Sequence, residues 1–112
     1  MSIYIKHKMN NIKIFENDLP NDINLSNEKV IGLDCEALGL VMGRDPLTLI
    51  QLGLENKNFY LIKLNRDNYH APNLVKILTN PNIQFIMHYA RQDMLWLKYH
   101  LKVSIKNIFC TK

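Results

Sequence analysis

Two acidic residues, Asp34 and Glu36, stand in an otherwise apolar segment of this chain. The segment Val30–Glu36 is short and apolar, which predicts a β-strand with covered faces. Because side chains alternate along a strand, both carboxylates would point to the same face, where they repel each other and resist desolvation. Carboxylates in this position are commonly paired or bound to a metal, so the spacing indicates a metal site. It is also compatible with a strand end whose two acids face water.

A third acidic residue, Asp93, lies in a segment with helical periodicity, Ala90–Leu101. At about 100° per residue, one face of this helix forms an apolar stripe made of Ala90, Met94, Leu97 and Leu101. Asp93 stands at the edge of that stripe, so we expect its carboxylate to face the margin of a sheet rather than open solvent. It also lies near the helix N-terminus, where the helix dipole stabilises an anion. The position therefore fits either a metal ligand or a first-turn acid that stabilises the helix.

The elements that would position these acids alternate between strands and helices. A polar, turn-rich loop is expected at Asn17–Lys29. Strands are expected at Ile3–His7, Lys13–Phe15, Val30–Glu36, Leu47–Leu54, Phe59–Leu64, Asn82–Met87 and Ile105–Cys110, and helices at Pro72–Thr79 and Ala90–Leu101. Three consecutive strands, followed by strands separated by helices, indicate an α/β fold with a mixed sheet and helices packed on it.

Composition sets the outer limits of these predictions. The chain has 112 residues, of which 47% are hydrophobic and 21% charged, which fits one small globular domain spanning residues 1–112. The net charge of +4 is compatible with a polyanionic partner. No apolar run approaches the roughly 20 residues of a membrane span, and the start lacks a secretory signal. We expect no membrane partner, a cytoplasmic location, and reduced, buried thiols at Cys35 and Cys110.

Two blocks of sequence resemble a known family. The stretch Ile31–Gly53, which contains Asp34-Cys35-Glu36, resembles the first exonuclease motif of the DEDD 3′→5′ exonucleases, and most closely that of ribonuclease D. The block His88–Lys98, which contains Asp93, resembles the second exonuclease motif. The blocks follow in the family's order, and the resemblance extends from about Ile3 to Lys112.

The resemblance implies a ribonuclease H-like mixed sheet, in which the first three strands are antiparallel and later strands parallel, with flanking helices. It implies a 3′→5′ exoribonuclease that hydrolyses single-stranded RNA 3′ ends, in RNA processing such as tRNA maturation. Asp34, Glu36 and Asp93 would be the catalytic, metal-binding acids of a two-metal site holding Mg²⁺ or Mn²⁺. Carboxylate oxygens suit such hard ions, which stabilise both the attacking and the leaving oxygen during phosphodiester hydrolysis.

The family's third motif supplies a fourth acid and a Tyr or His that orients the attacking water. It would lie downstream of Lys112, so the metal site is expected to be incomplete and the domain partial, or truncated. Activity of the isolated chain is accordingly doubtful, and a second polypeptide carrying the missing motif is a possible partner. The alternative is an inactive remnant or nucleic-acid-binding module of the same fold, or one half of a split enzyme.

Three further residues are candidates for contact with nucleic acid. Arg44 and Arg91 have the guanidinium groups that bind phosphates, and His88 ends a strand just before the helix that contains Asp93. Each has a structural alternative. His88 fits a hydrogen-bonded structural role, Arg91 a surface position, and Arg44 an ion pair with the neighbouring Asp45.

Overall fold

The computed structural model describes residues 11–39, 41 and 44–111, so the strand expected at Ile3–His7 lies outside the described residues. In chain order, the described elements are β1 (Ile12–Glu16), β2 (Val30–Ala37), β3 (Leu47–Leu54), β4 (Phe59–Lys63), α2 (Pro72–Leu78), β5 (Gln84–Met87), α3 (Ala90–Leu101) and β6 (Ile108–Cys110). The expected elements are confirmed there, with ends that shift by up to three residues, and Asn17–Lys29 forms no helix or strand.

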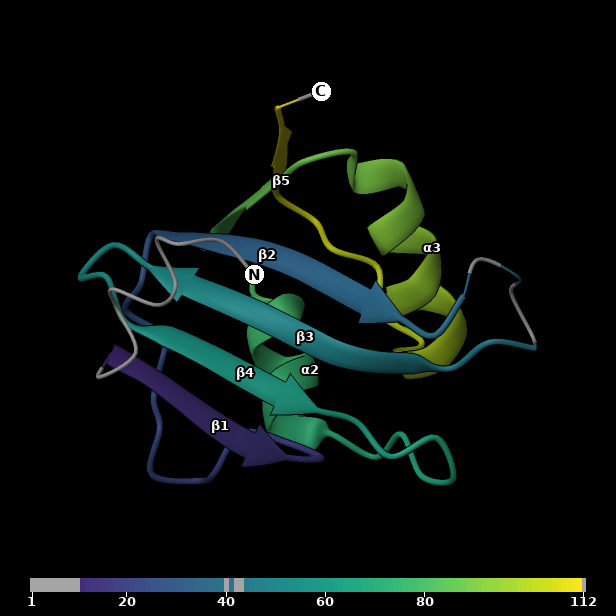
Figure 1. Cartoon of the computed structure of the whole chain (residues 1–112). Helices are drawn as coiled ribbons and strands as arrows, with labels where there is room; N and C mark the ends of the chain where they lie inside the picture. Colours follow the sequence, from purple (N-terminus) through teal and green to yellow (C-terminus); the bar gives the residue numbers. More distant parts are fainter. Residues whose placement is uncertain (1–10, 40, 42–43, 112) are drawn as a thin grey trace.

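Within the described part of the chain, six strands form one mixed sheet in the order β1-β4-β3-β2-β5-β6 (Figure 1). Strands β2, β3 and β4 are antiparallel neighbours, while β5 runs parallel to β2 and β6 parallel to β5. This confirms the expected ribonuclease H-like arrangement of antiparallel and then parallel strands. At the opposite edge β1 pairs in parallel with β4, so the N-terminal strand extends the sheet beyond the antiparallel unit.

One face of the sheet forms the core. Leu33, Ile50 and Ile62 project from neighbouring strands to this face and are almost fully buried. Figure 1 shows α2 behind β3 and β4 and α3 beside the end of β2, and the apolar side chains of both helices join the same hydrophobic cluster. The other face carries Asp34, which lies opposite Gln51 in the register of β2 and β3. One face of β2 therefore packs in the core, and the other face presents Asp34 outside it.

The loop before β2 is fixed to α2 by a carboxylate. Asp18 accepts hydrogen bonds from the backbone N–H groups of Leu19, Asn73 and Leu74 at 2.8, 3.0 and 2.8 Å. Asn73 and Leu74 lie in the first turn of α2, where backbone N–H groups lack partners within the helix. A residue distant in sequence thus caps this helix and stabilises its start.

The burial expected for both cysteines is wrong for Cys110. Its side chain is exposed, because the short strand β6 lies at the edge of the sheet and the sulfur is left outside the core. Cys35 is half-buried and packs against the core, as expected. No helix in the described residues is long and apolar enough to cross a membrane.

Candidate metal centre

The second half of β2 carries Asp34 and Glu36 on the open face of the sheet. In the register with β3, Asp34 lies opposite Gln51 and Glu36 opposite Leu49. Both acidic residues are exposed, whereas Leu33 on the other face is buried. The strand therefore places the two carboxylates side by side on the face that the core does not use.

Asp93 comes to this strand from α3. Strand β5 pairs only with Val30–Gly32 of β2, so the following half of that edge has no neighbouring strand among the described residues, and α3 lies against β2. The Asp93 carboxyl group hydrogen-bonds to the carboxylate of Asp34 and to the backbone of Cys35. The tertiary structure thus brings together two acids that are 59 positions apart, from a strand and a helix.

The electrostatic state of Asp93 reflects this crowding. The pKa of Asp93 is raised to about 7, chiefly by burial and then by repulsion from Asp34 and a hydrogen bond to it, while the hydrogen bond with the Cys35 backbone partly opposes the shift. The charge of Glu36 also raises this pKa. The side chain is only 8% exposed, and its Oδ2 atom is buried without a hydrogen-bond partner among the described residues. Near neutral pH, Asp93 is therefore partly protonated, and one of its oxygens has no hydrogen-bond partner among the described residues.

These residues fit a hard divalent cation in their chemistry but do not form a closed cage. Carboxylate oxygens are the ligands that Mg²⁺ and Mn²⁺ prefer, and a cation would satisfy the buried Oδ2 of Asp93 and offset the repulsion from Asp34. Among the residues that the structure describes, however, no three His, Cys, Asp or Glu side chains are grouped closely enough to hold one ion. Asp34 and Asp93 form the close pair, and Glu36 acts on it through its charge.

The structure also changes the helix face that periodicity predicted. Asp93, Trp96 and Leu97 are buried, while Met94 is only half-buried. The buried face of α3 keeps Ala90, Leu97 and Leu101 of the apolar stripe and extends toward Asp93 and Trp96. Trp96, which lies outside the stripe, is 3% exposed. Sequence periodicity missed this wider face because it weights apolar side chains and ignores a buried carboxylate.

Cys35 packs and is not available for reaction. Burial raises the pKa of its thiol, and the negative charges of Asp93, Asp34 and Glu36 raise it further. The thiol consequently stays protonated at neutral pH. This agrees with its position on the face of β2 opposite Asp34.

The loop after β2 is held by an ion pair. Asp45 accepts hydrogen bonds from Arg44 Nε at 2.8 Å and Nη2 at 2.9 Å, and from the Val41 N–H at 2.8 Å. These contacts lower the pKa of Asp45 to about 2, with the hydrogen bond from Arg44 as the largest cause. A side chain at Gly39 would collide with the Asp45 carboxylate, so the loop needs glycine there. The ion pair foreseen for Arg44 is thus present.

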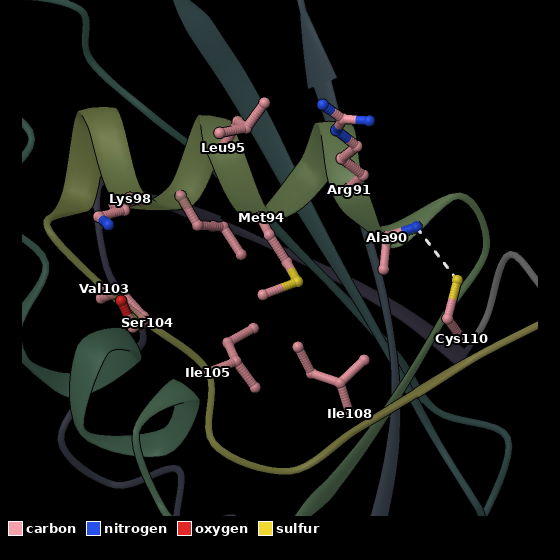
Figure 2. Close-up of a pocket in the computed structure, with 11 residues that line it drawn as sticks. Ala90, Arg91, Met94, Leu95, Lys98, Val103, Ser104, Ile105, Ile108 and Cys110 are labelled. Atoms are coloured by element: carbon pink, nitrogen blue, oxygen red, sulfur yellow. Dashed lines mark hydrogen bonds between the residues drawn. The ribbon is translucent and has the colours of Figure 1, made fainter.

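The other two nucleic-acid candidates lie at the start of α3. His88 is exposed and its Nδ1 is 2.9 Å from Thr111 Oγ1, which is the hydrogen-bonded alternative. Arg91 is exposed and points away from the protein at the outer side of α3 (Figure 2). Between them, Tyr89 adopts the left-handed conformation with φ 53°. Strained residues of this kind are frequent at functional sites, and nothing in the sequence indicated it.

An apolar pocket lies away from the carboxylates. It is an apolar groove of about 580 Å³ between α3 and the segment 103–110. Figure 2 shows Met94, Ile105 and Ile108 pointing toward one another across this groove. Its apolar lining suits packing against another segment rather than phosphodiester chemistry.

Comparisons with known proteins agree with this geometry. The sequence matches a family described as 3′-5′ exonuclease over residues 12–112. Structures of Brucella melitensis NrnC, one bound to pGG and one with bound Mg²⁺, are each 33% identical to the chain, with a TM-score of 0.84. Each match covers 90% of this chain, and 49% and 50% of those chains respectively. The chain therefore spans about half the length of NrnC.

A more distant similarity supports the fold alone. The EXD2 exonuclease domain soaked in Mg is 21% identical, with a TM-score of 0.64, over 77% of this chain and 45% of that chain. No curated protein matches the sequence.

Proposed function

The chain belongs to the 3′-5′ exonuclease family, and from this premise we propose that it provides the metal-binding part of a ribonuclease D-like exoribonuclease. Its substrate would be the 3′ end of single-stranded RNA in the cytoplasm, as in tRNA maturation. The reaction would be hydrolysis of the terminal phosphodiester bond, with Mg²⁺ or Mn²⁺ as the cofactor.

One observation carries the proposal: a strand acid and a helix acid interact, and one buried oxygen of the helix acid has no hydrogen-bond partner among the described residues. Asp93 Oδ2 is buried without a partner among the described residues, next to the carboxylate of Asp34. A purely structural acid would be expected to find donors, as Asp18 does at the start of α2. The missing interaction at Asp93 is the one that a cation would supply.

The roles of the three acids follow from their positions. Asp34 and Asp93 would hold one ion between β2 and α3, and Glu36, exposed on the same face of β2, would complete the ligand set from solvent. When bound, divalent ions lower the pKa of a water and stabilise charge on the leaving oxygen. Asp93 would release its proton on binding, because metal ligation requires the ionised carboxylate.

The comparisons support the cofactor and the class of substrate. NrnC was solved with bound Mg²⁺ and with pGG, and it is 33% identical over 90% of this chain. Because the chain spans about half of NrnC, the activity that we propose also needs the third motif. A segment carrying it, from the same chain or from a second polypeptide, would have the apolar groove beside α3 available for packing.

The decisive experiment is a time course with 3′-labelled single-stranded RNA and Mn²⁺, with and without a polypeptide that carries the third motif. We expect little or no digestion by the 112 residues alone, and stepwise shortening from the 3′ end once the motif is supplied. Asp34→Asn should abolish that activity while leaving the fold intact by circular dichroism. Shortening that continues in this variant would show that Asp34 is not a metal ligand.

A second candidate function is a nucleic-acid-binding module that does not cleave. It is favoured by the absence, among the described residues, of three side chains grouped to hold one ion. Binding of the same RNA with no shortening at any Mn²⁺ concentration, even with the third motif supplied, would favour this second function over the first.

A further inference from the structure

A polar pocket of about 320 Å³ lies at the C-terminal end of α3, against the loop before β3 and the loop after β4. Its lining differs sharply from that of the apolar groove, since it combines cationic and aromatic side chains. The main contributors are Arg44, Arg66, Lys102, Tyr69, Tyr99 and His100.

The pocket keeps an excess of positive charge. Asp45 is the acid in its lining, and its carboxylate is engaged by Arg44 through two hydrogen bonds. Within the described part of the chain, neither Arg66 nor Lys102 has a carboxylate at ion-pair distance. Lys102 Nζ donates instead to the Tyr99 carbonyl at 2.8 Å and lies 5.4 Å from the centre of the Tyr99 ring. Two cations therefore remain to attract an anion.

A histidine held by three aromatic rings forms one wall of the pocket. The His100 ring stacks on Trp96 at 5.4 Å and contacts Tyr69 and Tyr99, with centroids 4.8 and 4.9 Å away. Three aromatic neighbours fix its orientation. Its Nε2 atom is buried and has no hydrogen-bond partner among the described residues, so it is not exposed to the pocket. The ring therefore contributes a fixed wall, and the cations contribute the attraction for an anion.

The position of the pocket relates it to the candidate metal centre. His100 follows Asp93 by seven residues, or about two turns, so both lie on the same side of α3 roughly 10 Å apart. The loop between β2 and β3 also connects the candidate metal centre to the pocket. It begins just after Glu36, and it contains Arg44 and Asp45, which line the pocket. An extended strand of nucleic acid with its 3′ end at the carboxylates can reach this pocket.

We propose that the pocket binds a backbone phosphate of the substrate strand upstream of the bond that is cleaved, with the adjoining base on the exposed Tyr99 ring. Arg66 and Lys102 supply the charge, and Tyr99, 47% exposed, supplies the stacking surface. This inference rests on the proposed function, since it assigns the place where that enzyme holds its substrate away from the reaction.

The test measures binding of a fluorescent, 3′-labelled eight-nucleotide RNA by anisotropy in EDTA, where no metal-dependent cleavage occurs. Arg66→Gln and Lys102→Asn should each weaken binding about 5- to 10-fold and reduce the salt dependence by about one counterion. Asparagine is chosen because Lys102 has a left-handed backbone, with φ 59°, which asparagine tolerates. Lys13→Gln, an exposed lysine on β1, removes the same charge elsewhere and should change binding less than twofold.

Two substitutions of Tyr99 distinguish the contribution of base stacking from that of charge. Tyr99→Phe should bind RNA normally, while Tyr99→Ala should weaken binding several-fold without altering the salt dependence. All four substituted residues are exposed, so unfolding is not expected, and circular dichroism checks this. Equal losses in Arg66→Gln and Lys13→Gln, or no binding of this RNA at all, would overturn the inference.

Measuring binding in EDTA and shortening in Mn²⁺ keeps this outcome distinct from that of the proposed function. If binding depends on the pocket but no shortening occurs under any condition, the subsite stands and the exonuclease assignment fails. If shortening occurs and the pocket variants bind normally, the enzyme stands and the subsite fails.

Discussion

Two aspartates beside two helices have opposite surroundings. Asp18 lies outside α2 and accepts three backbone hydrogen bonds, two of them from the first turn of that helix. Asp93 lies inside the first turn of α3 and faces Asp34 and Glu36, with one oxygen left without a partner among the described residues. The first carboxylate has every donor that it needs, whereas the second is surrounded mainly by negative charge.

This difference suggests different roles for the two residues: Asp18 stabilises the fold, and Asp93 serves the proposed function. A carboxylate that caps a helix stabilises the fold in its ionised state. A buried carboxylate beside two others is held at the expense of stability, and such positions cluster where chemistry is done. The comparison therefore predicts that substitutions at Asp18 will change folding, and that substitutions at Asp93 will change metal binding and activity.

The largest effect is expected on activity. In the enzyme completed by the third motif, Asp93→Asn should lower the rate of RNA shortening by about 100-fold or more, because a charged group that positions the ion is lost. Asp18→Asn keeps an oxygen that accepts hydrogen bonds and should leave the rate within a factor of about two. Rates come from single-turnover gels, and equal losses in the two variants would remove the distinction.

The next effect concerns folding. Asp18→Ala removes three hydrogen-bond acceptor contacts, including the cap of α2, and should lower the free energy of unfolding by about 2 kcal/mol. In a domain of this size, that corresponds to a Tm lower by about 8 °C or more. Urea unfolding measures it, with the exposed Asp22→Ala as the matched control. A loss no larger than that of the control would argue against the cap.

A pH effect should follow from Asp93 in the metal-free protein. Its folded-state pKa of about 7 lies above the unfolded value of 3.8, so the native state binds more protons between these limits. Stability from this group is complete below pH 4 and is lost as pH rises through 7. We expect the native chain to lose about 1–2 kcal/mol between pH 6 and 8 in EDTA relative to Asp93→Asn.

The comparison with Asp93→Asn matters because His100 titrates in the same range. Its pKa is lowered by burial and by Lys102, so its contribution acts in the opposite direction and increases stability as pH rises. The difference between the two proteins cancels this contribution. Identical pH profiles for both would show that Asp93 is ionised throughout.

The smallest effect is that of the metal itself. At ten times its dissociation constant, Mn²⁺ should stabilise the native chain by about 1.4 kcal/mol, seen as a rise of several degrees in Tm. Asp34→Asn should remove the rise, and Asp18→Asn should retain it. An unchanged Tm of the native chain at millimolar Mn²⁺ would leave no support for a metal site in these 112 residues.

The sequence alone predicted most of the architecture. Period-2 and period-3.6 patterns located β3 and α3 without error and placed the other described elements within a few residues, since these patterns record which side chains must be buried. Alternation along β2 also fixed Asp34 and Glu36 on one face and Cys35 on the other. These properties are local, so neighbouring residues suffice to determine them.

Only the tertiary structure decided how the acids relate to one another. Among the described residues, the short β5 leaves part of the β2 edge without a strand, and α3 packs there with a face that buries Asp93 beside its apolar stripe. Cys110 is left exposed at the sheet edge, and Arg66 comes from a distant segment to line one pocket with His100 and Lys102. No local pattern contains this information, because it depends on which surfaces remain free once the sheet has formed.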